Sequence, residues 1–368
     1  MSIPPLTIGI EEEYQLIDPE TRELAPANDE LMDRGEEFLP GQLRPEMMRS
    51  QIEVGSQVCA SVKEARAEMV RLRKGVRALA AEFGLEVVAA STHPFSQWME
   101  QVRTPKNRYQ KLEEDLRDVA RRLLIFGMHI HVGIEDQELR IDVLNQARYF
   151  VPHLLALSTS SPFFCGRDTG LKSYRSVIFE NMPRSGISPI FRSWSDYENY
   201  CNTLVKTSCI DEPTKIWWDV RPHPKFPTVE FRMSDMCTRI DEMLCIAALT
   251  QAVAAKLLKL RRGNRSWRTY RQHLITENKW RAVRYGIDGQ LIDFGKQSEA
   301  PVKDLINELL EFVDDVVEDL DSREEVDYVQ TILEGGTSAD RQIATYRKTD
   351  DLKAVVDQLI AETREGCD

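Results

Sequence analysis

Hydrophobic and charged residues alternate along the first patterned stretch of the sequence, Gly9–Asp18. Side chains of a β-strand point alternately to its two faces. The stretch therefore predicts a strand with an apolar face (Ile8, Ile10, Tyr14, Leu16) and a polar face (Glu11, Glu13, Gln15). Neighbouring carboxylates on one face repel each other unless the face is open to water or a cation neutralises them. Taken alone, the stretch is most simply interpreted as a solvated edge strand.

Four later stretches repeat the alternation: Gln51–Gly55, Met128–Ile134, Ile216–Arg221 and Val229–Met233. In each, apolar residues occupy one parity, and the charged or imidazole side chains on the other parity are Glu53, His129, His131, Asp219, Arg221, Glu230 and Arg232. Together the stretches predict one antiparallel sheet with an apolar back and a polar front. A front that only faced solvent would be expected to carry Lys, Thr and Ser. The observed set instead indicates a functional face.

Helical patterning dominates the rest of the chain. Val62–Phe83 has apolar residues at helical spacing, starts with a capping box at Ser61 and Glu64, and precedes a predicted strand at Leu85–Ala89. Further predicted helices lie at Asp142–Leu157, at Met243–Leu260 within a C-terminal region that is almost wholly helical from Arg239, and at Asp350–Glu365. Strands followed by helices predict the α+β class.

Length and composition restrict the organisation of the protein. No composition break, linker or repeat divides the 368 residues, so residues 1–368 are predicted to form a single domain. The net charge of −12 argues against nucleic acid as the main partner. The sequence has no apolar run of membrane-spanning length and no signal-peptide core, which predicts a cytoplasmic protein with no membrane partner. Seven scattered cysteines without a CxxC pair indicate reduced thiols, with Cys237 and Cys245 as core residues.

The polar front suggests metal-dependent chemistry. Carboxylates with an occasional histidine favour hard divalent ions such as Mg²⁺ or Mn²⁺ over structural zinc. Glu230 and Arg232 lie on the same face of one stretch, so the same surface could hold a metal and bind an anion. This combination suits phosphoryl transfer. The sequence contains neither GxxxxGK[ST] nor GxGxxG, so a bound ATP would have to be held by metals and side chains.

Several residues admit more than one interpretation. His129-Ile130-His131 is also typical of metal-dependent amidohydrolases, although the later sequence lacks the barrel pattern of that fold. Trp218 is predicted to lie in the core, and the place of Trp217 is left open. Glu12 falls on the apolar parity of its strand, where it either pairs with an arginine of a covering helix or reaches the site from the strand end.

The order and spacing of several motifs resemble those of the glutamate–cysteine ligase type 2 family of carboxylate–amine ligases. The motifs are Gly9-Ile10-Glu11-Glu12-Glu13-Tyr14 with Asp18-Pro19, Glu53 in its strand, His129-Ile130-His131-Val132-Gly133, Tyr174-Arg175, Arg221-Pro222-His223 and Thr228-Val229-Glu230-Phe231-Arg232. The resemblance covers nearly the whole chain. It implies a glutamine-synthetase-like curved antiparallel sheet, with helices on its back and ATP and divalent metals at its open, polar face.

The resemblance also implies roles for individual residues. Glu11, Glu13, Glu53, His129 and Glu230 match metal-binding positions, and Glu46 lies seven residues before Glu53 as an acid does in related ligases. Arg232 matches an arginine near the transferred phosphoryl group, while Arg175 and Arg221 are candidates for gripping a substrate carboxylate or phosphate. His131 departs from the amide-type residue of more distant ligases, so both a metal-ligand and a substrate-contact role stay open. Asp219, on the polar parity, is a candidate to accept the proton of the amine.

The activity implied is ATP-dependent joining of a carboxylate, that of glutamate, to an amine such as cysteine through an acyl phosphate. The expected partners are ATP, an amino-acid carboxylate and an amine, with a homodimer as the expected assembly. Two rival hypotheses are a metal-dependent amidohydrolase-like hydrolase and a catalytically silent sensor of ATP or an amino acid. A silent relative would usually have lost a ligand residue, whereas all the acidic candidates are present here.

Overall fold

The structure is a computed structural model that describes residues 6–27 and 29–367. Its centre is an antiparallel sheet with the strand order β10-β11-β5-β1-β3-β2, to which β4 adds by pairing with β1. The strands are β1 (Ile8–Ile17), β2 (Leu43–Pro45), β3 (Gln51–Gly55), β4 (Glu86–Val88), β5 (Met128–Gly133), β10 (Val220–Pro222) and β11 (Thr228–Phe231). The long first strand thus lies inside the sheet and not at its edge, so the interpretation of this stretch as a solvated edge strand was wrong.

The strand register brings the polar residues of different strands together. Glu11 lies opposite His129, and Glu13 lies opposite Glu53. Glu230 lies between its partners His131 on β5 and Arg221 on β10. Because these residues share one face of neighbouring strands, their side chains meet in front of the sheet.

One predicted strand is divided in the structure. Ile216–Arg221 forms β9 (Trp217–Trp218), which pairs with β8 (Ser185–Gly186) in a separate two-stranded sheet, and β10 in the main sheet. Asp219 lies at the break between them. Trp218 is buried as predicted, at 3% exposure.

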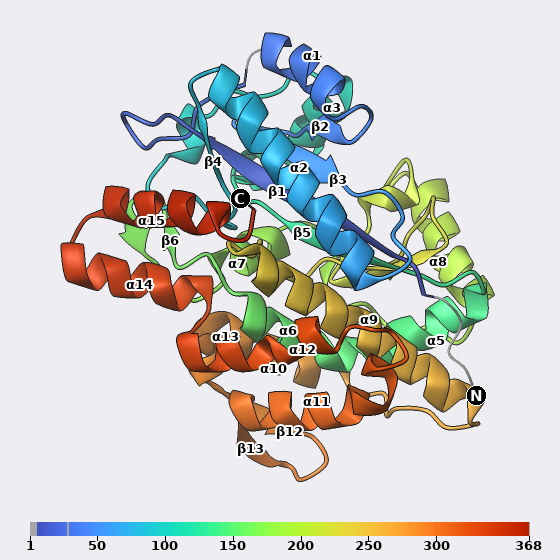
Figure 1. Cartoon of the computed structure of the whole chain (residues 1–368). Coiled ribbons are helices and arrows are strands. Elements are labelled where there is room, and N and C mark those ends of the chain that lie inside the picture. The colour runs from blue at the N-terminus through green and yellow to red at the C-terminus, as the bar shows by residue number, and fades with distance from the viewer. Residues whose placement is uncertain (1–5, 28, 368) are drawn as a thin grey trace.

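Two long helices cover the apolar back of the sheet (Figure 1). Helix α2 (Val62–Glu82) packs on β1 and β4, and α9 (Ile240–Arg262) packs on β5 and on α2. Ser61 accepts a hydrogen bond from the Glu64 amide as predicted, but the Glu64 carboxylate returns to the amide of Ala60. Contrary to the expectation that no apolar run has membrane-spanning length, α9 is long and apolar enough to cross a membrane, yet 83% of its apolar window is buried inside the protein, as in a core helix.

The remaining helices surround this core. They are α1 (Asp29–Phe38), α3 (Asn107–Leu116), α4 (Asp118–Arg121), α5 (Gln137–Ala147), α6 (Val151–Ser158), α7 (Tyr174–Glu180), α8 (Trp194–Lys206), α10 (Gln272–Tyr285), α11 (Val302–Val317), α12 (Arg323–Asp327), α13 (Val329–Gly335), α14 (Ser338–Thr349) and α15 (Leu352–Arg364). Two small hairpins are formed by β6 (Phe163–Phe164) with β7 (Arg167–Asp168) and by β12 (Gln290–Asp293) with β13 (Ser298–Pro301).

Two helix predictions were wrong in detail. The expected single helix Asp142–Leu157 is interrupted by a 3₁₀ turn at Arg148–Phe150, just before Pro152. Proline lacks the amide proton that a continuous helix would use at this point, so the chain starts a new helix instead. The hairpin β12–β13 was also missed within the C-terminal helical region.

Glu12 pairs with an arginine of the covering helix α2. Arg73 Nε donates to Glu12 Oε2 at 3.0 Å, and both side chains have 0% exposure. Arg73 also donates to the backbone carbonyls of Cys237 and Thr238, and the Tyr14 hydroxyl bonds Glu12. Arg73 therefore ties both β1, through Glu12, and the segment before α9, through its carbonyls, to α2.

Arg73→Met is expected to destabilise the protein by about 3–5 kcal/mol, because it leaves the Glu12 carboxylate buried without a counter-charge. Chemical denaturation checks this. The double variant Arg73→Met/Glu12→Gln should recover much of the loss, and a double variant as unstable as the single one would contradict the explanation.

None of the seven cysteines, which all lie in the described part of the chain, forms a disulfide. Cys237 and Cys245 are fully buried, and burial raises the pKa of both thiols well above the ordinary value. They are core residues, as expected.

Candidate active site

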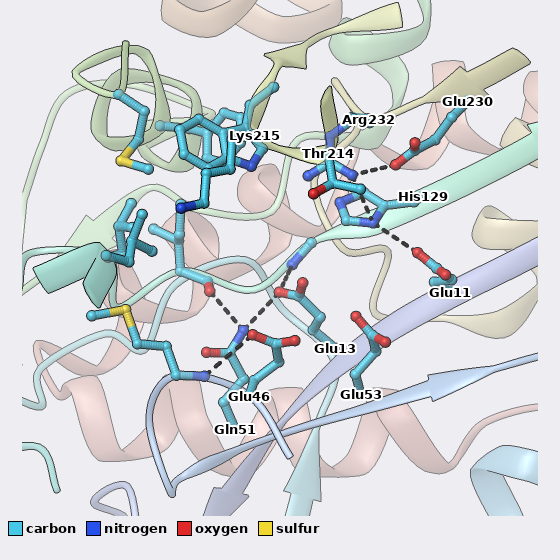
Figure 2. A pocket seen from close by; sticks show the side chains of 18 of the residues that line it. Glu11, Glu13, Glu46, Gln51, Glu53, His129, Thr214, Lys215, Glu230 and Arg232 are labelled. Carbon is cyan, nitrogen blue, oxygen red and sulfur yellow. Dashed lines mark hydrogen bonds and ion pairs between the residues drawn. The ribbon is translucent and has the colours of Figure 1, made fainter. Parts of the chain in front are cut away.

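A cavity of about 350 Å³ opens in front of the polar face of the sheet. Nine of the residues singled out from the sequence line it: Glu11, Glu13, Glu46, Glu53, His129, Arg175, Arg221, Glu230 and Arg232. Figure 2 shows that the acidic side chains of β1 and β3 point toward His129 and the Glu230–Arg232 pair from the neighbouring strands. His131 lies beside this set, and Asp219 does not line the cavity.

Four carboxylates crowd one side of the cavity. Burial raises the pKa of Glu53 well above its ordinary value, and repulsion from Glu11, Glu46 and Glu13 adds to the shift. Burial also raises the pKa values of Glu13 and Glu46. Burial and mutual repulsion thus disfavour the charged forms of these carboxyl groups in the free protein.

Glu13 is held in place by two donors that the sequence did not reveal. The amide of Gly127 donates to Glu13 Oε2 at 2.6 Å and Gln51 Nε2 donates to the same oxygen at 2.7 Å. Position 127 is crowded, because an added Cβ would lie 3.0 Å from both Arg175 Nη2 and His129 Nε2. A larger residue here would have to displace these side chains of the site.

Glu11, His131 and Glu230 form the tightest cluster of metal-binding atoms among the described residues. One ligand atom from each lies within 4.8 Å of the other two. His131 Nδ1 contacts Thr228 Oγ1 at 3.1 Å, while its Nε2 is buried and has no hydrogen-bond partner in the described structure. Two carboxylates and an unpaired imidazole nitrogen fit a divalent cation such as Mn²⁺ or Mg²⁺.

His129 lies on the other side of Glu11. Its Nδ1 is 3.2 Å from Glu11 Oε2 and 3.5 Å from Arg232 Nη1. Burial raises the pKa of Glu11, but the hydrogen bond from His129 and the nearby His131 imidazole, whose Nε2 lies 3.6 Å from Glu11 Oε2, outweigh this effect and hold that pKa well below its ordinary value. Glu11 is therefore the carboxylate that both histidines share.

Arg221 and Arg232 flank the buried carboxylate of Glu230. Arg221 Nε donates to Glu230 Oε2 at 2.7 Å and its Nη1 donates to the backbone carbonyl of Thr214 at 2.9 Å. Arg232 Nη1 donates to the other oxygen of Glu230. Burial raises the pKa of Glu230, but the two guanidinium groups more than offset it and keep that pKa well below its ordinary value.

Two arginines of the wall keep unused donors. The Nε atoms of Arg175 and Arg232 are buried and have no hydrogen-bond partner in the described structure. Arg175 Nη2 donates to the backbone carbonyl of Arg232 at 3.1 Å, so the Arg175 guanidinium group lies beside the backbone of Arg232. Unpaired guanidinium donors in a cavity wall are suited to an anion. Arg221, by contrast, is occupied in holding Glu230.

One candidate, Asp219, takes a place that differs from the one expected, whereas Glu46 lines the cavity. Asp219 turns away from the cavity and binds Lys279, with Nζ 2.7 and 2.8 Å from its two carboxylate oxygens. We therefore do not assign it as the proton acceptor. Glu46 lies in the cavity wall, where it accepts hydrogen bonds from the Met47 amide at 3.2 Å and from Arg108 at 3.3 Å.

The opposite wall of the cavity was not found from the sequence. It contains apolar and aromatic residues from helices, loops and the two-stranded sheet, namely Met47, Tyr109, Leu112, Leu123, Ile125, Phe179, Met182 and Trp217, together with Lys215. Apart from Trp217, which lies in the alternating stretch Ile216–Arg221 and whose place was left open, these residues belong to segments without alternating patterns, so nothing in the sequence marks them as neighbours of the carboxylates.

Comparisons with known proteins agree with this geometry. The family model for glutamate–cysteine ligase family 2 matches residues 7–358. A protein of Herpetosiphon aurantiacus, provisionally named glutamate–cysteine ligase 2, is 56% identical over 98% of this chain and 94% of its own length. A protein of Roseiflexus castenholzii with the same provisional name is 54% identical over 98% of this chain and 96% of its own.

Among solved structures, glutamate–cysteine ligase of Francisella tularensis in complex with AMP has the same fold. The TM-score is 0.72 at 14% identity, and the match covers 99% of this chain and 90% of that one. The α+β, glutamine-synthetase-like fold expected from the sequence is thereby confirmed. With the family model, the relatives and the fold in agreement, the chain belongs to glutamate–cysteine ligase family 2, a family of ATP-dependent carboxylate–amine ligases.

Proposed function

We propose that this protein uses ATP to convert the γ-carboxylate of glutamate into an acyl phosphate and then joins that acyl group to an amine, cysteine or another amino compound. The observation that carries the proposal is the pairing, in one cavity, of a cluster of carboxylate and imidazole ligands with two guanidinium groups that keep free donors. The names of the relatives support glutamate as the acid and cysteine as a candidate amine.

Glu11, His131 and Glu230 would hold a divalent cation, Mg²⁺ or Mn²⁺, with Glu13, Glu53 and His129 around them. Bound there, the cation would screen the charge of the triphosphate. Arg175 and Arg232 would donate their free N–H groups to oxygens of the transferred phosphoryl group, and so stabilise charge that is spread over those oxygens during transfer.

In the first step an oxygen of the glutamate carboxylate would attack the γ-phosphorus, and ADP would leave. In the second, the amine would attack the acyl carbon and inorganic phosphate would leave, carrying that carboxylate oxygen. The amine must lose a proton on the way. None of the described side chains is placed as a dedicated base for it, and the departing phosphate is itself a base of suitable strength.

Hydroxylamine should intercept the activated acid. With ATP, Mg²⁺ and glutamate, but without another amine, the protein is expected to form glutamyl hydroxamate together with ADP and phosphate. Mass spectrometry and phosphate release measure both products. Oxygen-18 in the substrate carboxylate should appear in the released phosphate. Label found only in the amide, with formation of AMP, would contradict an acyl phosphate, and product formed without ATP would indicate a hydrolase.

Metal binding should also change stability with pH. The pKa of Glu53 is raised in the folded protein, so the folded state holds this proton more tightly than the unfolded chain does. The contribution of Glu53 to the stability of the metal-free protein is therefore expected to fall as pH rises above about 4.5. Mg²⁺ with ATP should raise the melting temperature by roughly 5 °C at neutral pH, and by less in acid.

Glu53→Gln provides the matched test of this prediction. It should raise the melting temperature of the metal-free protein at neutral pH, because one of the repelling charges is removed. It should also reduce the Mg²⁺–ATP shift. A variant that is less stable without metal, with an unchanged shift, would remove Glu53 from the metal site.

A further inference from the structure

A buried lysine outside the cavity binds two carboxylates from different segments. Lys279 of α10 places its Nζ 2.7 and 2.8 Å from the carboxylate oxygens of Asp219, and 2.7 Å from Glu180 Oε1. The lysine side chain is only 4% exposed, and that of Asp219 is 6% exposed. Lys279 does not line the cavity, so it has no direct contact with a substrate bound there.

Lys279, Asp219 and Glu180 thus form a charged triad. Within it, the backbone of Asp219 supports Arg232. The backbone carbonyl of Asp219 accepts a hydrogen bond of 2.7 Å from the amide of Arg232, and the amide of Asp219 donates to the carbonyl of Gly186 at 2.9 Å. Asp219 stands between β9 and β10, and its two backbone hydrogen bonds link the segments of Gly186 and Arg232. Its side-chain bond to Lys279 therefore anchors the residue whose backbone holds the Arg232 amide.

The Glu180 side supports Arg175. Glu180 is the last residue of the short helix α7, Phe179 precedes it, and Arg175 lies in the first turn of the same helix. The Phe179 ring lies beside both guanidinium groups, with its centroid 5.6 Å from Arg175 Cζ and 6.0 Å from Arg232 Cζ. Holding the end of α7 thus holds the aromatic ring that both arginines contact.

We infer that Lys279 is a positioning residue, which sets the spacing of Arg175 and Arg232 by tying the two segments that carry them. A buried ion pair is weak evidence for stability, since well-packed apolar residues often stabilise a core as well. The triad differs from an apolar contact because its charged hydrogen bonds fix both the distance and the direction between Lys279 and each carboxylate. Its catalytic consequence rests on the proposed function, whereas its effect on anion binding does not.

The experiment compares three variants with the wild-type protein. Lys279→Met removes the tie and leaves Asp219 uncompensated, so its melting temperature should fall. Lys279→Met/Asp219→Asn removes both charges and should recover most of that fall. Arg341→Met is the matched control, because Arg341 also joins two buried carboxylates, Glu242 and Glu362, but does not line the cavity.

Two readouts are measured on each protein. The first is the rise in melting temperature caused by tripolyphosphate in the presence of a chelator, which reports anion binding without metal or turnover. The second is hydroxamate formation with ATP, Mg²⁺, glutamate and hydroxylamine. In the Lys279→Met/Asp219→Asn variant, the tripolyphosphate shift should fall to less than half, and kcat should fall about 10- to 100-fold. KM for hydroxylamine should be unchanged. Arg341→Met should lower only the melting temperature.

The inference is overturned if the double variant, with its melting temperature restored, keeps the wild-type tripolyphosphate shift and kcat. In that case Lys279 is structural. Absence of hydroxamate with the wild-type protein would instead reject the proposed function. The tripolyphosphate shift would then still decide the role of Lys279.

Discussion

Replacing Arg232 by lysine is expected to reduce ATP- and glutamate-dependent hydroxamate formation by about 10²- to 10³-fold while the protein still folds. Lysine keeps the positive charge but lacks the planar fork of donors. In the structure Nη1 of that fork donates to Glu230, while Nε has no hydrogen-bond partner among the described residues. An ammonium group that stayed with Glu230 would leave the phosphoryl oxygens without this donor.

Steady-state kinetics with circular dichroism and thermal melting check the result. Arg184→Lys is a suitable control, because Arg184 stacks on Trp217 beside the cavity but is not among the residues that line it. Turnover of Arg232→Lys within a few-fold of wild type would show that Arg232 is structural.

Glu230→Gln is expected to lower the same activity by on the order of a thousandfold. Glu230 takes part in two groups of contacts in the site. It pairs with Arg221 and Arg232, and it offers one atom of the metal-binding cluster. Glutamine keeps the size of the side chain but removes the charge that balances the two guanidinium groups. The variant should therefore also be less stable without metal.

The sign of the stability change separates this prediction from a general effect of altering the cavity. The pKa of Glu230 is lowered, so its charge stabilises the fold, whereas the pKa of Glu53 is raised, so its charge destabilises the fold. Glu230→Gln and Glu53→Gln should move the metal-free melting temperature in opposite directions while both reduce activity. Equal changes in stability would contradict the electrostatic description of the site.

The proposed function divides the cavity between two kinds of chemistry. The carboxylates and histidines of β1, β3, β5 and β11 would contact the metal and the phosphate groups of ATP. The apolar wall around Phe179, Met182 and Trp217 would contact other parts of the substrates. A panel of amines of increasing apolar size, tested against glutamate and ATP, would show which amine the second step accepts.

The polar face of the sheet was determined by the sequence alone. Strand side chains alternate with a period of two, so Glu11, Glu13 and Glu53 had to share a face opposite the apolar residues of their strands. The same period placed His129, His131, Glu230 and Arg232 on that face. Periodicity also identified α2, and apolar composition identified a helix within α9.

Only the tertiary structure decided which partner each of these residues contacts. The register places His131 opposite Glu230, and His131 joins Glu11 and Glu230 in the metal-binding cluster. Arg221 is occupied by Glu230, and Asp219 is turned toward Lys279. None of this follows from alternation within a strand, which fixes the face of a side chain but not the partner it meets across the sheet.

The same limit explains the residues that were missed. Gly127, Phe179 and Lys279 lie in a loop and in two helices, and each acts on the site through a contact with a segment far away in the sequence. The local pattern of apolar and charged residues indicates which residues can be buried or paired. The choice among partners is made by packing of distant segments, where one buried charge binds whichever opposite charge the fold brings within about 3 Å.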